Sequence, residues 1–259
     1  MTTVAPSPEE IYDRSEQEGR RRLNLSLLDQ VATGFIAGVT IVFGIVALGV
    51  VQALVEPEFG PELAKLGGAL AFGIGLVFLI VGRAELFSEN FFGPVAAAID
   101  ARTGGTWIRL GRLWGVILVL NLVGGAVLLA VLLVDGALPE ESRSALVKVA
   151  EEIVAKEWSA TLARAVLAGA LITLLSYMLK AVNTVAARIL VAYMVGVFLA
   201  LGPFDHVIVS ALHVLFGVWA SDAVTYADVG INIVLSTIGN LVGGLLLITL
   251  THTAQVKSG

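Results

Sequence analysis

Long apolar runs separated by short polar segments dominate the pattern along the chain. A helix needs about 20 mainly apolar residues to cross the hydrocarbon layer of a membrane. Four runs are long enough and carry few polar side chains: residues 31–55, 113–134, 158–179 and 229–251. The pattern therefore predicts an integral membrane protein built from helices.

Two further apolar segments are interrupted by polar residues. Both are predicted to be broken helices, with breaks at residues 83–90 and 202–206 and apolar pieces on either side at residues 66–82, 91–99, 189–201 and 207–220. Unwound backbone at membrane depth persists only where it lines a cavity or is buried in protein. The two breaks therefore predict the location of the functional site.

A short sequence recurs in the two halves of the chain. The stretch NLVGG begins at Asn121 and again at Asn240, an offset of 119 residues. The same offset carries Phe87 to His206, which brings the two breaks into register. Each half then holds three spans, and an odd number gives the halves opposite orientations. The sequence predicts an all-α integral membrane protein with six transmembrane helices in an inverted 3+3 repeat, its halves at about 31–134 and 158–251.

The predicted domains follow from polarity. Residues 1–27 are expected to form a cytoplasmic segment with a short surface helix at about 8–18, because Ser7, Pro8 and Glu10 suit a helix start. This segment lacks the apolar stretch of a signal peptide. Residues 28–251 are the predicted transmembrane domain, and residues 252–259 a cytoplasmic C-terminal tail.

The distribution of basic residues predicts the orientation. Lys and Arg accumulate on the cytoplasmic side of membrane proteins. With the N-terminus inside, 10 basic residues face the cytoplasm and 4 face the outside, which favours a multi-pass protein of the inner or plasma membrane with both termini cytoplasmic. The inner set is Arg14, Arg20, Arg21, Arg22, Arg102, Arg109, Arg112, Lys180, Arg188 and Lys257; the outer set is Lys65, Arg143, Lys148 and Lys156.

Composition narrows the functional classes. Hydrophobic residues make up 57% of the chain and charged residues 14%, whereas a soluble protein carries roughly a quarter. The net charge of −5 argues against nucleic-acid binding. The chain has no cysteine, so disulfides, iron–sulfur clusters and zinc–thiolate sites are excluded. No catalytic or nucleotide-binding motif is present, and neither an enzyme nor a cofactor is predicted.

Two histidines occur near the second break. His206 follows Pro203 in apolar surroundings, where an ionisable side chain is costly and therefore a functional candidate; a hydrogen-bonded structural histidine is the alternative. His213 lies seven residues further on, along the same helical face. A metal site needs three or four ligands, so His213 is interpreted as structural and no metal is predicted.

Charged residues near the breaks allow two interpretations each. Arg83, Glu85 and Glu89 either neutralise one another as a buried cluster, which is favoured because buried charges usually persist only when paired, or line a path directly. Lys156, which has acidic neighbours, is either a solvated loop charge or a residue that captures an anion.

The sequences at the breaks resemble the formate/nitrite transporter family, and more closely its divergent, poorly defined branch. The resemblance covers roughly residues 20–257 and rests on GRAELFSEN from Gly82, RLWGVILVLNLVGG from Arg112, PFDH from Pro203 and GNLVGG from Gly239. It implies an aquaporin-like protomer with its own pore. It further implies a homo-oligomer, a pentamer, in the lipid bilayer.

The resemblance also implies roles for individual residues. His206 and Asp205 resemble the central proton relay, and Lys156 resembles a lysine at the periplasmic mouth. The pore constrictions correspond to Leu86, Phe87, Ser88, Phe72, Leu199 and Phe204. Four positions depart from the family pattern: Asp205 replaces a glutamate, Leu199 an aromatic residue, and Ser210 and Gly169 each replace an asparagine.

The expected function is a channel or transporter for small monovalent anions of weak acids, such as formate or nitrite, with proton coupling through His206. Two alternatives remain open. An aquaporin-like pore for water or small neutral solutes fits the fold but not the absence of paired Asn-Pro-Ala loops. A non-conducting membrane scaffold or sensor is the other alternative.

Overall fold

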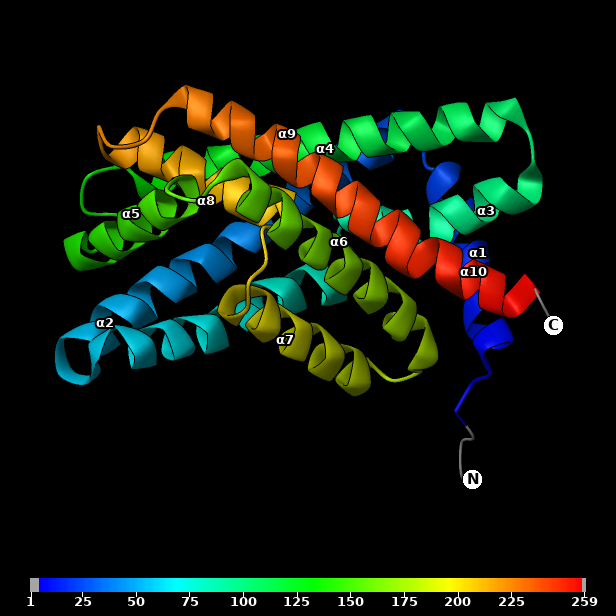
Figure 1. The fold of residues 1–259 in the computed structure, drawn as a ribbon, viewed down its shortest axis with the longest axis horizontal. Coiled ribbons are helices and arrows are strands. Elements are labelled where there is room, and N and C mark those ends of the chain that lie inside the picture. Colours follow the sequence, from blue (N-terminus) through cyan, green and yellow to red (C-terminus); the bar gives the residue numbers. More distant parts are fainter. Residues whose placement is uncertain (1–4, 258–259) are drawn as a thin grey trace.

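The computed structural model describes residues 5–257, in which every regular element is a helix (Figure 1). Residues 1–4 of the predicted cytoplasmic segment and 258–259 of the predicted tail lie outside the described residues. Helix α1 (Pro8–Leu23) begins with the expected capping box between Ser7 and Glu10, and extends beyond the predicted end at residue 18. It lies at one end of the molecule, close to the C-terminus (Figure 1).

Helix α2 (Leu27–Val81) is a hairpin of two helical arms. The chain reverses at Gly60, whose φ of +78° lies in the left-handed region that glycine adopts without strain. The arms pack closely, since a Cβ on Gly44 would lie 2.9 Å from the Phe72 carbonyl oxygen. The predicted spans 31–55 and 66–82 are these two arms (Figure 1), although most residues between them are helical as well.

Helical structure is interrupted at both predicted breaks. The first break follows Val81 and leads into the short 3₁₀ helix η1 (Phe87–Phe91) and helix α3 (Gly93–Ala101). The second break separates helix α7 (Val185–Leu201) from helix α8 (Val207–Ala220). The polar interruptions in the sequence thus correspond to real breaks in the helices.

The remaining elements are α4 (Gly104–Leu132), α5 (Glu140–Val154), α6 (Trp158–Ala181), α9 (Tyr226–Val242), the π-helical turn η2 (Gly243–Thr249) and α10 (Leu250–Lys257). The last three form one continuous helical stretch. Residues 252–257 of the predicted tail are helical and continue this stretch. Helix α5 lies between two predicted spans and was not predicted.

Small residues allow helices to approach closely in both halves of the chain. A Cβ on Gly38 of α2 would lie 2.0 Å from the Asn121 carbonyl oxygen of α4. On α6, a Cβ on Gly169 would lie 2.1 Å from the Asn240 carbonyl oxygen of α9. Such contacts between backbones are typical of membrane helices, where packing rather than hydrophobicity drives association.

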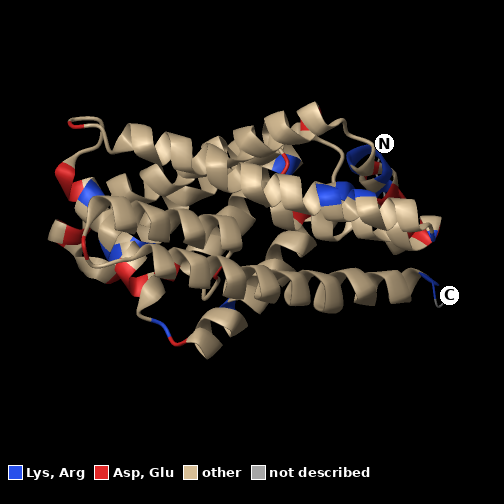
Figure 2. Cartoon of the chain, turned by 90° about the horizontal axis from the view of Figure 1, so that it is seen from above, with Lys and Arg blue, Asp and Glu red and all other residues tan. Residues whose placement is uncertain are grey.

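The distribution of surface side chains is that of a membrane protein. Helices α2, α4 and α6 and the stretch Tyr226–Lys257 are each long and apolar enough to cross a membrane. Large apolar side chains are widely exposed, for example Leu28 at 77% and Ile108 at 75%. Charged residues gather mainly toward the two ends of the molecule and leave a largely uncharged middle (Figure 2). This middle zone matches the hydrocarbon layer of a membrane.

Candidate functional site

The first break is held by one buried asparagine of α4. The Asn121 Oδ1 atom accepts a hydrogen bond of 3.0 Å from the Phe87 backbone N–H. Its Nδ2 atom donates to the carbonyl oxygens of Glu85 at 3.0 Å and Gly34 at 2.9 Å. These bonds satisfy backbone groups that water cannot reach in a bilayer.

The second break is held in the same way by Asn240 of α9. Its Oδ1 atom accepts from the Val207 backbone N–H at 3.0 Å, and its Nδ2 atom donates to the carbonyls of Asp205 at 3.1 Å and Ala165 at 2.8 Å. Because Asp205 takes the place of Glu85, the offset at the breaks is 120 residues instead of 119. His206 therefore corresponds to Leu86, and the expected match with Phe87 is wrong by one residue.

A hydrogen bond connects the two breaks directly. The Ser88 hydroxyl lies 2.5 Å from the His206 Nε2 atom, and both residues are buried. Either group can donate, depending on the tautomer of the imidazole. The His206 Nδ1 atom is buried and has no hydrogen-bond partner among residues 5–257. One nitrogen of His206 is thus fixed, and the other is available.

A cavity of about 450 Å³ opens beside His206. We call it the large cavity. The predicted constriction residues Phe72, Leu199 and Phe204 line it, together with Asp205 and Lys156. Ser210, His213 and Arg164 also line the large cavity, and the sequence did not assign them to a site.

Two basic side chains hold the carboxylate of Asp205 at the large cavity. The Lys156 Nζ atom lies 2.5 Å from Asp205 Oδ1, and the Arg164 Nε atom lies 3.3 Å from Asp205 Oδ2. Burial lowers the pKa of Lys156, and the hydrogen bond to Asp205 opposes this shift. Lys156 is therefore an ion-pair partner of the second break and not the solvated loop charge that its neighbours suggested.

A second pocket, of about 70 Å³, lies at the first break on the side of α1. We call it the small pocket. Arg83, Glu85 and Glu89 all line it, which places the predicted charge cluster in one location. Its lining has five basic and three acidic side chains in all: Arg21, Arg22, Arg83, Lys180 and Arg188, with Glu18, Glu85 and Glu89. The lining of the small pocket therefore carries an excess of positive charge.

The ion pairs in the small pocket differ from those expected. Glu85 binds Arg22, at 3.0 Å, and Arg21, at 3.1 Å, whereas Arg83 is exposed with a left-handed φ of +56°. Arg22 also donates to the Glu89 carbonyl oxygen. The partners of the buried carboxylate thus come from α1, more than 60 residues away. The only signal in the sequence was the run of three arginines at the end of that helix.

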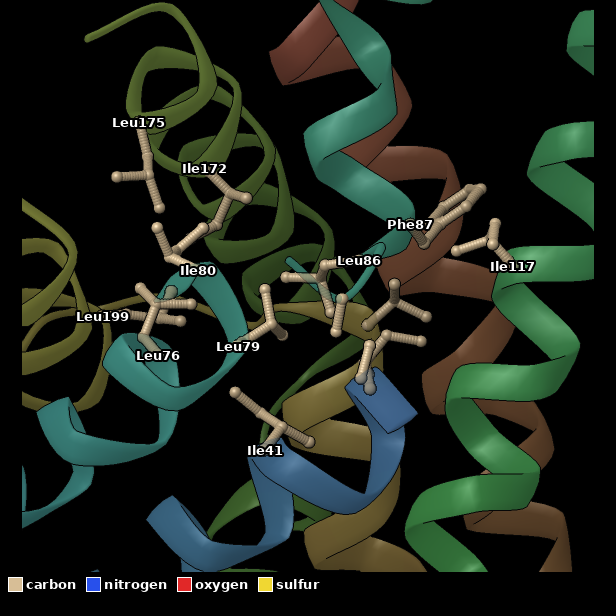
Figure 3. Packing of buried hydrophobic residues seen from close by; sticks show 14 of the residues in the cluster. Ile41, Leu76, Leu79, Ile80, Leu86, Phe87, Ile117, Ile172, Leu175 and Leu199 are labelled. Carbon is tan, nitrogen blue, oxygen red and sulfur yellow. The ribbon is translucent and has the colours of Figure 1, made fainter. Parts of the chain in front are cut away.

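A buried apolar layer separates the large cavity from the small pocket. Phe72 lines the cavity and Ile80 lines the pocket, while Leu76, midway between them on α2, lines neither. Figure 3 shows a layer around Leu76 formed by the side chains of Leu79, Ile80, Leu86, Ile172, Leu175 and Leu199. A charged molecule cannot cross such a layer without a large desolvation cost.

The side chains of the adjacent residues Leu86 and Phe87 point in different directions. Leu86 points into the apolar layer, whereas Phe87 lies toward Ile117 of α4 (Figure 3). The ring of Phe87 packs edge-on against Phe91, with 4.9 Å between the centroids. Leu86 is therefore part of the apolar layer, and Phe87 packs against Phe91 beside the first break.

Comparison with known proteins identifies the family. Residues 9–254 match the formate/nitrite transporter family. The chain belongs to the formate/nitrite transporter family. This confirms the family that the two breaks indicated, and members of this family are channels and transporters and not enzymes.

Relatives and solved structures agree with this assignment. The chain is 26% identical to "Inner membrane protein YfdC" of Escherichia coli, with 96% of this chain and 78% of that protein covered. It is 25% identical to "Formate channel FocA" of Haemophilus influenzae, with coverages of 96% and 94%. The fold is similar to a structure described as "FNT family ion channel", with a TM-score of 0.81, 19% identity and coverages of 95% and 98%.

A second structure, "Pentameric formate channel with formate bound", has a TM-score of 0.76 at 20% identity, with 88% of this chain and 97% of that chain covered. Together with family membership, these similarities confirm an all-helical membrane protein of the channel and transporter class. A multi-pass location in the plasma membrane is consistent with the inner-membrane relative and the apolar helices.

Two departures from the family pattern have visible structural consequences. The Ser210 hydroxyl lies 2.9 Å from the His206 carbonyl oxygen and 2.9 Å from Asn232 Oδ1, so an amide from α9 reaches the position where the family has asparagine. Gly169 packs directly against the Asn240 backbone, where a larger side chain would collide. Both residues thus support the second break.

Proposed function

We propose that this protein is a channel or transporter for small monovalent anions of weak acids, of the size of formate or nitrite. The observation that carries this proposal is the position of His206. Its ring bridges the two helix breaks through Ser88 and lines the large cavity, and its free nitrogen is buried. A histidine in this position can donate a hydrogen bond when neutral and a proton when charged.

The proposed path runs from the large cavity through the apolar layer to the small pocket. An anion in the cavity meets His206 and takes up a proton from it. The resulting neutral acid crosses the layer around Leu76 and Leu86, where a bare charge would be strongly disfavoured. It releases its proton to water beyond the small pocket, where the excess of basic side chains favours the anion, and His206 regains a proton from the side of the large cavity. Asp205 positions the backbone next to His206.

We infer that the membrane domain spans residues 28–251 as six transmembrane segments in an aquaporin-like inverted repeat. Counting the two arms of α2 separately, and α7 with α8 as one broken span, supports this number. The matching hydrogen bonds of Asn121 and Asn240 support the repeat. With both termini cytoplasmic, as the excess of basic residues favours, the small pocket faces the cytoplasm and the large cavity faces the periplasm.

The protein is further proposed to assemble as a homo-pentamer in the lipid bilayer, with one path in each protomer. The pentameric formate channel of similar fold supports this assembly. Lys156 is the proposed anion-capture residue. Its position on the wall of the large cavity, next to Arg164, supports this role, although Asp205 holds it.

The decisive test is flux into proteoliposomes. Purified protein is reconstituted, and uptake of labelled formate and nitrite is measured with and without an inward proton gradient. We expect uptake that saturates and rises with external acidity. Swelling with neutral solutes alone would instead support a water or solute pore, and the absence of any flux would support a non-conducting scaffold.

A further inference from the structure

His213 lines the same large cavity as His206. It lies seven residues further along α8, which is about 10 Å at the rise of an α-helix. The side chain is 4% exposed, so it is almost completely buried. Sequence reasoning interpreted this residue as structural, and its place in the cavity wall could not be foreseen from one helix alone.

The hydrogen bond of His213 determines what the residue offers to the cavity. The Nδ1 atom lies 2.9 Å from the Val209 carbonyl oxygen. A carbonyl oxygen can only accept, so Nδ1 carries the hydrogen. In the neutral ring, Nε2 then presents a lone pair. This Nε2 atom is buried and has no hydrogen-bond partner in the described part of the chain.

A buried acceptor without a donor is costly, and such groups call for an explanation. Ser210, one turn before His213, already directs its hydroxyl to the His206 carbonyl and to Asn232. The nearest hydroxyl on the same helix is thus engaged elsewhere. No side chain of residues 5–257 donates to His213 Nε2, so a molecule in the cavity can supply the donor.

We propose that His213 binds the transported molecule, with its Nε2 atom accepting a hydrogen bond from the O–H group of the protonated weak acid. This inference rests on the proposed function and adds the chemical form that the cavity binds. A carboxylate or nitrite anion has only acceptor atoms, and the lone pair of Nε2 would repel it. The neutral acid has one O–H donor, so only this form can make the bond. No covalent bond forms or breaks in this step.

His206 and His213 then act at successive points of the path. The two residues are about 10 Å apart along α8, which is longer than a one-carbon acid. One molecule therefore does not bridge both rings. His206 lies at the break, next to Ser88, and exchanges the proton. His213 lies two turns further from the break and binds the acid form in the outer part of the large cavity, whereas His206 protonates the anion form at the break.

His252 provides a matched control within the chain. Its Nδ1 atom makes the same bond to a carbonyl four residues earlier, 2.9 Å from Ile248 O. Its ring packs against Tyr177 and Phe92 at the other end of the molecule, away from the large cavity. Replacing His252 therefore removes a histidine with the same local bond but without a place in the cavity wall.

The test measures formate uptake against concentration for the reconstituted full chain, with His213→Leu, His213→Gln and His252→Leu as variants. We expect His213→Leu to raise the half-saturating concentration about 2- to 10-fold, the usual effect of losing one hydrogen bond, with a nearly unchanged maximal rate. His213→Gln should restore the wild-type value, because its amide oxygen accepts. Inhibition by nitrate, which stays unprotonated, should not weaken in His213→Leu, because nitrate offers no O–H group to Nε2.

A wild-type half-saturating concentration in His213→Leu would overturn this inference, as would an equal shift in His213→Gln or in His252→Leu. If His213→Leu fails to assemble, His213→Met replaces it, because its flexible side chain also lacks a strong acceptor. Absence of flux in the wild-type protein would contradict the proposed function itself. The two failures are therefore distinguishable.

Discussion

The two helix breaks use the same backbone support but present different side chains. At each break an asparagine makes three hydrogen bonds to backbone groups, through Asn121 at the first and Asn240 at the second. The residue between the supported groups is Leu86 at the first break and His206 at the second. The same backbone support thus presents an apolar side chain at one break and an ionisable side chain at the other. In the proposed function, the first excludes charge and the second exchanges the proton.

The breaks also differ in the source of their counter-charges. Asp205 is paired with Lys156 and Arg164, which lie just before α6 and on it. Glu85 is paired with Arg21 and Arg22 of α1, outside the membrane-spanning helices. The carboxylate of Asp205 at the second break is therefore neutralised by residues of the membrane domain itself. The carboxylate of Glu85 at the first break is neutralised by the N-terminal helix α1.

The largest effect is expected from the shared support. Asn121→Leu and Asn240→Leu each leave two buried backbone groups of a break unsatisfied, because the third acceptor, Gly34 or Ala165, lies within a helix. The cost of about 1–3 kcal/mol per group is a large part of the stability of a typical domain. Both variants should fail to form a folded oligomer in detergent, as measured by size-exclusion chromatography and thermal unfolding.

Asn232→Leu is the matched control for these two variants. Asn232 is also buried on α9, but its bond is to the Ser210 hydroxyl and not to a break in the backbone. It should unfold at a temperature much closer to that of the wild type. An Asn121 or Asn240 variant as stable as the Asn232 variant would show that the two breaks do not share one support.

The next largest effect is expected from His206, the ionisable residue at the second break. His206→Phe should remain a folded oligomer but lose acid-stimulated anion uptake, at least tenfold, because it removes the proton-carrying group next to Ser88. Uptake at several external pH values measures this. Ser88→Ala keeps the imidazole and should retain the pH response at a lower rate. A wild-type pH response in His206→Phe would remove the proposed role.

A smaller effect is expected from Leu86, the apolar residue at the first break. Leu86→Ala should increase flux several-fold or admit larger anions, because Leu86 points into the apolar layer. Phe87→Ala should instead lower the thermal stability, since removing a buried phenylalanine typically costs about 3–5 kcal/mol. Acetate and formate uptake, together with unfolding temperatures, separate the two outcomes. Increased permeation in Phe87→Ala alone would reverse the roles assigned to these neighbours.

The smallest effect is expected from Glu18 of α1, the helix whose arginines pair with Glu85 at the first break. Burial raises the pKa of Glu18, but the hydrogen bond from Arg21 and the charges of Lys180 and Arg22 outweigh it, and the net result is a pKa of about 2 instead of 4.5. Arg21 and Arg22 belong to α1 itself, so only the part of the lowered pKa that comes from Lys180 of α6 stabilises docking. This contribution is present above pH 4.5 and is lost as the pH falls toward 2. The protection factors of α1, which correct for the slower intrinsic exchange in acid, should therefore fall between pH 4.5 and 3.

Glu18→Gln is the control for this pH dependence. The variant should exchange faster than the wild type at pH 6 and show a smaller change on acidification. If wild type and variant lose protection in parallel, Glu18 does not contribute to the docking of α1.

Local patterns in the sequence were sufficient to predict the helical spans and the two interruptions. Spans such as 158–179 follow from composition, and the breaks follow from clusters of polar residues within apolar surroundings. The turn at Gly60 was missed in its details, because residues 56–65 are polar and suggested a loop although most of them are helical. The register between the halves was off by one at the breaks, since the extra residue lies in irregular backbone where no periodicity applies.

The sequence predicted which residues form the site better than it predicted their contacts. His206, Ser88, Leu86 and Lys156 were named from the sequence, and the structure places them around the path that we propose. Their partners were not foreseen: Arg22 for Glu85 and Asp205 for Lys156 are separated by 63 and 49 residues. Nothing in the local pattern of either residue encodes such a pairing.

The sequence by itself determined that the chain is a helical membrane protein, where its helices break, and to which family it belongs. These properties depend on short-range composition, because the hydrocarbon layer requires long apolar helices and excludes unsupported polar backbone. The tertiary structure alone decided which arginines neutralise Glu85, that Leu86 and His206 occupy equivalent positions, and that His213 faces the large cavity. Those facts depend on which helix faces pack together, and packing joins residues that are distant along the chain.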